Sequence, residues 1–196
     1  MKYLTEKQVG SLFDGLDKNS KFFVRNQALV TFMVSTGLRV AEATGLNIGD
    51  VLNDQGKVRD ELVVRKEIAK NGKERMVPLN NDAKKAICTI MQFNDSEKFV
   101  INAKSALIIS RKHCRITPRQ IQRIIENARN KADLDVKATP HTLRHTFAKT
   151  LYENTNRVTT VQRILGHNSL KTTMIYTEAS KEEMIEQVNT LHFAPK

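Results

Sequence analysis

The sequence contains 196 residues, 40% of them hydrophobic, so the chain can bury a core and is most simply a single domain, residues 1–196. A formal net charge of +11 makes a polyanion the expected partner, although charge alone gives no sequence specificity. Two cysteines without a CxxC pattern, no apolar run of about 20 residues and no apolar leader argue against a disulfide framework, a zinc ribbon, a membrane span and a secretory signal. We expect a cytoplasmic, nucleoid-associated protein without a membrane partner.

The first third of the chain predicts three helices. Thr5 opens a capping box with Gln8, and an apolar face follows at helical spacing. A strongly apolar helix is predicted from about residue 22 to 36 and ends at Gly37, because glycine tolerates a left-handed C-terminal position. Arg39 therefore follows a helix end directly, and a short helix, VAEATGL, comes next.

A β-hairpin is predicted in the middle of the chain. Two strands are expected around Leu62 to Glu67 and Arg75 to Leu79, joined at residues 70–73, where Asn-Gly is a strong hairpin signal. Pro78 suits the end of an edge strand. With helices on both sides of this hairpin, the expected fold class is α+β: a mainly α-helical domain with a small antiparallel β-sheet.

The next helices carry a basic face. A helix is predicted from Asn81 to about Phe93, a short extended or loop segment from Leu107 to Ser110, and a further helix that Thr117 caps and Pro118 opens. The outward positions of that last helix are polar and mostly basic, which suits either a DNA-contacting surface or an ordinary solvated face. These positions are Arg119, Gln122, Arg123, Glu126, Arg129 and Asn130.

The last third gathers the groups that suit phosphate chemistry. Thr139 and Pro140 repeat the cap pattern, so His141 lies in a first helical turn with Arg144 three residues later on the same face. A helix from Thr160 to Leu165 is expected to end at Gly166, which leaves His167 at a turn. Further helical segments are predicted before Tyr176 and from Ser180 to about Val188.

These side chains together describe a phosphate pocket beside a nucleophile. Two arginines can each present a planar fork of donors to the oxygens of one phosphate, and a nearby tyrosine oxygen can attack phosphorus. Protein cations then supply the charge stabilisation, so no metal is expected. Singly the residues have plainer explanations: Arg39 as a salt-bridged arginine, His145 as a structural histidine, Glu42 as an arginine partner. Cys114 beside His113 lacks further ligands at zinc spacing.

Four segments in order, TGLRVAEATGL, AKNGKERMVPL, HTLRHTFA and LGHNSLKTTMIYTEAS, resemble the catalytic domain of the tyrosine recombinase (phage integrase) family over nearly the whole chain. The resemblance implies paired arginine clamps, a hairpin lysine as general acid, two site histidines and a tyrosine nucleophile. The residues are Arg39 and Arg144, Lys70 with Lys73 as the alternative lysine, His141 and His167, and Tyr176. The DNA contacts we expect are Arg119, Gln122, Arg123, Lys73 and Arg75.

What the resemblance implies is site-specific recombination through a covalent 3′-phosphotyrosine, without cofactor or metal. The partners implied are double-stranded DNA, a homo-tetramer assembled on it from monomers, and accessory DNA-bending proteins. The sequence begins where the catalytic domain of that family is expected to begin, so we expect the family's N-terminal core-binding domain to be absent, as in either an excised fragment or a naturally short member. Two other functions stay open: a type IB topoisomerase that nicks and closes one duplex, and a DNA-binding regulator that does not cut.

Overall fold

The computed structural model describes residues 3–99 and 101–166. The described chain is mainly helical with one two-stranded antiparallel sheet, as predicted. Its helices are α1 Glu6–Asp14, α2 Phe23–Thr36, α3 Val40–Gly45, α4 Asn81–Ser96, α5 Pro118–Lys131, α6 Pro140–Thr155 and α7 Val158–Leu165. The strands are β1 Glu61–Val64 and β2 Arg75–Pro78, and a 3-10 turn spans Ile48–Asp50.

The local cap signals form as predicted. The Thr5 and Thr117 side chains each complete a capping box at the start of α1 and α5, and Thr139 caps α6. Gly37 and Gly166 adopt left-handed conformations, with φ of 62° and 63°, and end α2 and α7. These two ends matter for the site, because each presents a backbone carbonyl group to it.

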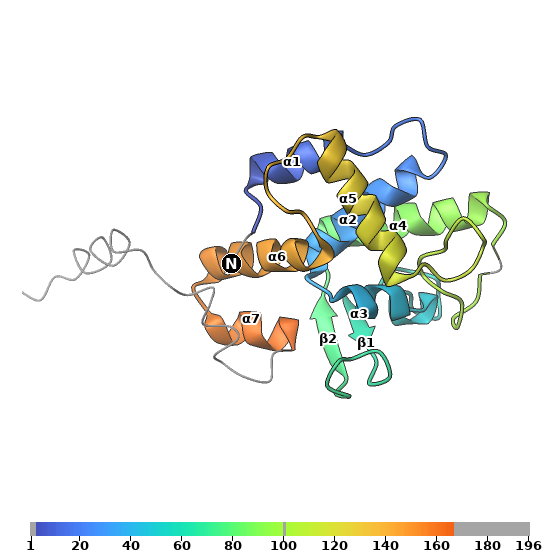
Figure 1. Ribbon diagram of the computed structural model, residues 1–196. Coiled ribbons are helices and arrows are strands. Elements are labelled where there is room, and N and C mark those ends of the chain that lie inside the picture. Colours follow the sequence, from blue (N-terminus) through green and yellow to red (C-terminus); the bar gives the residue numbers. More distant parts are fainter. Residues whose placement is uncertain (1–2, 100, 167–196) are drawn as a thin grey trace, which may run out of the picture.

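The central element is α2, which packs against α4 and α6 (Figure 1). Its residues Leu29, Phe32 and Met33 are buried in the main apolar core. Helix α5 packs on α1, while α7 lies beside β2 and α6 (Figure 1). A smaller apolar cluster, centred on Val161 and Leu165, joins α7 to α6. The arrangement brings the start of α3, the start of α6 and the end of α7 to one side of the domain.

The hairpin differs from the prediction. Strand β1 ends at Val64 rather than Glu67, and Val64 pairs with Arg75, so a ten-residue segment, 65–74, joins the strands in place of a tight Asn-Gly turn. The carbonyl oxygen of Arg65 accepts from the amides of Ile68 and Ala69, 3.1 and 3.0 Å away, and this local turn ends the ladder. The Asn-Gly pair instead occupies a second turn, which the amide of Gly72 closes by donating to Ala69 O.

Gly37 is expected to tolerate no side chain. A Cβ atom there would lie 2.3 Å from Phe147 Cδ1, in addition to the cost of a φ of +62°. We expect Gly37→Ala to lower the free energy of unfolding by about 2–4 kcal/mol in denaturant titrations. Gly56→Ala is the matched control, with φ of +73° and no atom within 4 Å, and should lose only about 1 kcal/mol. Equal losses would mean that Phe147 simply moves aside.

Candidate active site

Arg39 and Arg144 meet at the end of α7. Arg39 is the N-cap residue of α3, and Arg144 lies one turn into α6 with only 3% of its surface exposed. Arg144 Nη2 donates to the carbonyl oxygen of Leu165 over 2.8 Å, and Arg39 Nη1 approaches the same oxygen at 3.4 Å. Arg144 Nη1 also donates to Gly37 O at 2.6 Å. Two residues that are 105 positions apart in the sequence therefore present their guanidinium groups to one oxygen atom.

Glu42 holds Arg39 in place and is itself held by Arg75. The fully buried carboxylate accepts from Arg39 N at 2.9 Å and Arg39 Nη1 at 3.0 Å. Arg75 donates to both carboxylate oxygens, with distances of 2.9 and 2.8 Å. Burial by itself would raise the pKa of Glu42, but the hydrogen bonds and charges of Arg75 and Arg39 outweigh burial and hold that pKa below its usual value. The expectation that Glu42 pairs with arginine is confirmed.

Arg75 was expected to contact DNA, and the structure places it elsewhere. Its guanidinium faces inward to Glu42, its Nε donates to Ile164 O at 3.1 Å, and 11% of its side chain is exposed. A Cβ atom on Gly166 would lie 2.9 Å from Arg75 Cδ, so the end of α7 rests directly on this arginine. Arg75 thus supports the site from within and links β2, α3 and α7.

Two histidines stack on α6 beside the arginines. The rings of His141 and His145 lie edge to face with centroids 4.1 Å apart. Burial, followed by the charges of Arg144 and Arg39, lowers the pKa of His141, so its imidazole is neutral at pH 7 and can accept a proton. His141 is exposed, whereas His145 is buried, as expected of a structural residue.

Acid is expected to destabilise the fold through His145. Burial, together with His141 and Arg144, lowers the pKa of His145 from 6.5 to about 4. The unfolded chain therefore takes up a proton that the folded chain does not, so stability is complete above pH 6.5 and falls by roughly 3 kcal/mol as the pH drops to about 4. His145→Asn should remove most of this decline in denaturant titrations. In the exposed control, His113→Asn, the decline should persist. If both variants showed the same dependence of stability on pH, the assignment of the decline to His145 would be wrong.

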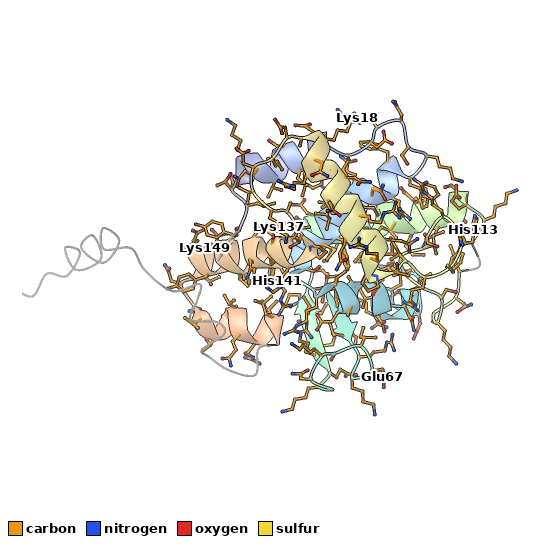
Figure 2. The ribbon with its side chains drawn as sticks, in the orientation of Figure 1. Lys18, Glu67, His113, Lys137, His141 and Lys149 are labelled. Atoms are coloured by element: carbon orange, nitrogen blue, oxygen red, sulfur yellow. The ribbon has the colours of Figure 1, made fainter. Side chains whose placement is uncertain are left out.

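A groove of about 510 Å³ leads from His141 along α5. Lys137 and His141, both labelled in Figure 2, lie at its α6 end, and Val40, next to Arg39, lies at its α3 end. From α5 it is lined by Arg119, Gln122, Glu126 and Arg129. The outward face predicted from the sequence thus shares a groove with His141. Of the other expected DNA contacts, Arg123 is exposed on the same helix but lies outside this groove.

Lys70 and Lys73 lie on the segment between the strands, and both are exposed. Lys70 occupies the turn that Ala69 and Gly72 close. The segment is anchored on α3, because Ile68 packs so closely on Gly45 that a Cβ atom there would lie 2.5 Å from Ile68 Cγ2. The lysines therefore sit on a loop fixed next to the helix that Arg39 caps.

His167, Tyr176 and the expected last helix lie outside the described residues. Within the described residues, no group of three or more His, Cys, Asp or Glu side chains could hold a metal ion, and no helix is long and apolar enough to cross a membrane. Sequence reasoning missed the carbonyl groups of Gly37 and Leu165 as partners of the arginines. The two helix-ending glycines were the only signal of them, since each places a helix end beside a candidate residue.

The site thus combines two arginines that converge at helix ends, a neutral histidine and a groove with a basic lining, an arrangement that can hold a phosphate group. The chain belongs to the phage integrase family, whose match spans residues 2–183. It is 33% identical over 192 residues to the tyrosine recombinase XerC of Corynebacterium glutamicum, a match that covers 97% of this chain and 59% of that protein. It is 35% identical over 174 residues to XerD of Bifidobacterium longum, covering 86% of this chain and 54% of the relative.

Solved structures agree with this membership. The fold matches the XerA recombinase with a TM-score of 0.75 and 29% identity, over 100% of this chain and 67% of that one. It matches the XerH site-specific recombinase bound to its difH substrate with a TM-score of 0.76 and 26% identity, over 96% of this chain and 54% of that one. The chain thus spans little more than half the length of the curated relatives named above.

Proposed function

We propose that this chain cleaves and rejoins strands of double-stranded DNA as a site-specific recombinase, with Tyr176 as nucleophile. The observation that carries the proposal is the meeting of Arg39 and Arg144 at the Leu165 carbonyl oxygen. A carbonyl oxygen carries partial negative charge, and the non-bridging oxygens of a phosphodiester carry more. Guanidinium groups that converge on a carbonyl oxygen are therefore also suited to bind phosphate oxygens. The relatives named XerC and XerD tyrosine recombinases support the same chemistry.

In the proposed reaction the Tyr176 oxygen attacks phosphorus, and the bond from phosphorus to the 5′-oxygen breaks. The phenolic proton passes to neutral His141, and the leaving 5′-oxygen takes a proton from Lys70, for which Lys73 is the alternative. Arg39 and Arg144 hold the phosphate oxygens while charge redistributes on them, and His167 either donates a hydrogen bond to the phosphate or positions Tyr176. A 3′-phosphotyrosine and a free 5′-hydroxyl result, and attack by a 5′-hydroxyl reverses the step.

His141 is suited to accept the proton. Tyrosine has a pKa of about 10 in water and is a poor nucleophile at neutral pH without a base or nearby cations. Burial, with a further contribution from Arg144 and Arg39, lowers the pKa of His141 and keeps its ring in the accepting form; the charges of the same two arginines also favour a tyrosinate beside them. The arrangement therefore supports deprotonation of the nucleophile at physiological pH.

The groove along α5 gives the proposed DNA path. Arg119 and Gln122 line it together with His141, and Lys73 lies exposed on the loop between the strands. Recombination joins two duplexes and needs four cut strands, so four copies would assemble on DNA from monomers, and accessory DNA-bending proteins would aid the assembly. We place this activity in the cytoplasm, on the nucleoid.

The test is formation of a covalent adduct in EDTA. The chain is incubated with a pool of nicked duplexes of randomised sequence, in which the short released fragment, which carries the free 5′-hydroxyl, diffuses away. Adducts are recovered on denaturing gels. The wild type should yield an EDTA-resistant adduct and Tyr176→Phe none. Tyr152→Phe is the matched control on α6 and should retain the adduct. Duplex binding without any adduct would contradict strand cleavage and favour a non-cutting regulator.

A further inference from the structure

Arg25 is a buried cation whose hydrogen bonds to Asn26 and Ile109 reach only neutral oxygens. It is 4% exposed, and its Nη1 donates to Ile109 O at 2.6 Å while its Nη2 donates to Asn26 Oδ1 at 2.6 Å. Among the described residues no carboxylate oxygen lies within ion-pair distance of Arg25. Burial, and next the charge of Arg111, lowers the pKa of Arg25 to about 10, so the group stays charged at pH 7. Buried charges are normally paired, and this one has a full positive charge to offer to a ligand.

Further cations crowd around the same aromatic ring. The Phe22 ring centroid lies 4.8 Å from Arg25 Cζ, 5.3 Å from Arg111 Cζ and 5.0 Å from Lys21 Nζ. Glu97 offsets part of the repulsion but is itself bonded to Lys21 at 3.1 Å. The cluster therefore has a surplus of positive charge that an anion would neutralise.

These arginines open into a pocket of about 190 Å³ beside the first turns of α5. Arg25, Arg111 and Arg123 line it, and none of its lining residues is acidic. Neutral amides complete the polar wall, from Asn26, Gln120 and Asn127. Water occupies about 30 Å³ per molecule in the liquid, so the pocket has room for a phosphate group.

The pocket lies on the other flank of α5 from His141. At 3.6 residues per turn, the side chains that line this pocket are centred roughly 130° around the helix from those that line the His141 groove. The exposed ridge of α5 runs between the two, opposite the buried residues Ile121, Ile125 and Ala128. A helix with side chains is about 10–12 Å across and the DNA major groove about 12 Å wide, so a helix lying in that groove has one sugar-phosphate backbone on each flank.

The geometry points to a second phosphate site, in which Arg25, Arg111 and Arg123 together hold one phosphodiester of the DNA strand that passes α5 on the flank opposite His141. This inference rests on the proposed function for DNA as the ligand, but not on cleavage. The contact fixes the register of the duplex against α5, because phosphate contacts position DNA without reading its sequence.

The salt dependence of duplex binding tests the site. Each phosphate contact contributes about 0.9 to the slope of log affinity against log salt. In fluorescence anisotropy with a short duplex, Arg111→Gln/Arg123→Gln should lower the slope by about 0.9, since both arginines share one phosphate. Adding Arg25→Gln, if that variant folds, should lower it no further. Lys85→Gln, an exposed lysine on α4, is the control and should keep the wild-type slope.

Other results overturn the inference. An unchanged slope in the double variant removes the site, and a fall of about 1.8 shows two separate surface contacts instead of one shared phosphate. In a second experiment, inorganic phosphate is added at constant ionic strength, and the melting temperatures of the wild type and of the double variant are measured. Phosphate that stabilises the wild type but not the double variant, together with an unchanged DNA slope, would assign the pocket to a free anion. DNA binding needs no strand cleavage, so the binding results can be interpreted even if the adduct assay fails.

Discussion

Arg144→Lys is expected to slow formation of the covalent adduct by about 10²–10³-fold, the cost of removing one preorganised donor to a developing anion. Bonds to Gly37 O and Leu165 O fix the plane of the Arg144 guanidinium, which suits two phosphate oxygens at once. A lysine at this position keeps the charge but offers no planar fork. The measurement is the single-turnover rate of adduct formation on a duplex recovered from the randomised pool.

Two controls make the Arg144 result specific. Arg157→Lys, at the exposed N-cap of α7, makes the same chemical change away from the clamp and should react at the wild-type rate. Circular dichroism of Arg144→Lys establishes that it is folded before rates are compared. A rate within a few-fold of wild type would show that a point charge suffices and that the fork geometry has no role in the reaction.

Glu42→Gln is expected to lower the free energy of unfolding by about 3–5 kcal/mol, as is typical when one partner of a buried ion pair is removed. The amide cannot accept from Arg75 and Arg39 as the carboxylate does, so the Arg75 charge is left buried without a counter-charge. Denaturant titration measures the loss. Glu74→Gln, an exposed neighbour of Arg75, is the control and should change stability by less than about 0.5 kcal/mol.

A double-mutant cycle separates the ion pair from general disruption. Glu42→Gln/Arg75→Gln removes both charges, so its loss should be smaller than the sum of the two single losses by at least about 1 kcal/mol. A strictly additive result would indicate that Glu42 and Arg75 stabilise the domain independently, and the view of one shared network would then be wrong.

Helix ends could be predicted well because the signals are local. The capping boxes at Thr5 and Thr117 and the helix-ending glycines, Gly37 and Gly166, each act within a few residues of chain, and all four formed. The hairpin was predicted less well, since the strength of Asn-Gly as a turn signal was outweighed by the tertiary contacts of Arg65. Arg65 Nε donates to Asp50 Oδ1 at 2.8 Å and Arg65 Nη2 donates to Gly45 O at 3.0 Å, contacts that the neighbouring residues in sequence do not reveal.

The candidate site also combines features that local sequence predicts with contacts between residues far apart in the sequence. His141 and Arg144 share a face because they lie three residues apart on one helix, which the sequence predicts directly. The bond between Glu42 and Arg75 joins residues 33 positions apart, and a basic residue at the start of a strand looks the same in sequence whether it faces DNA or a buried carboxylate. Arg25 was missed for a similar reason: its burial depends on Phe22 and Ile109 meeting across the fold.

The carbonyl group of Leu165 links the position of two arginine side chains to the position of the chain that leads to Tyr176. It is the oxygen at which Arg39 and Arg144 meet, and only Gly166 separates it in sequence from His167, with Tyr176 following on the same stretch of chain. Any displacement of the end of α7 therefore moves both the oxygen at which Arg39 and Arg144 meet and the point from which the chain continues to Tyr176, the proposed nucleophile. A change at α7 would then act on the proposed phosphate clamp and on the proposed nucleophile together.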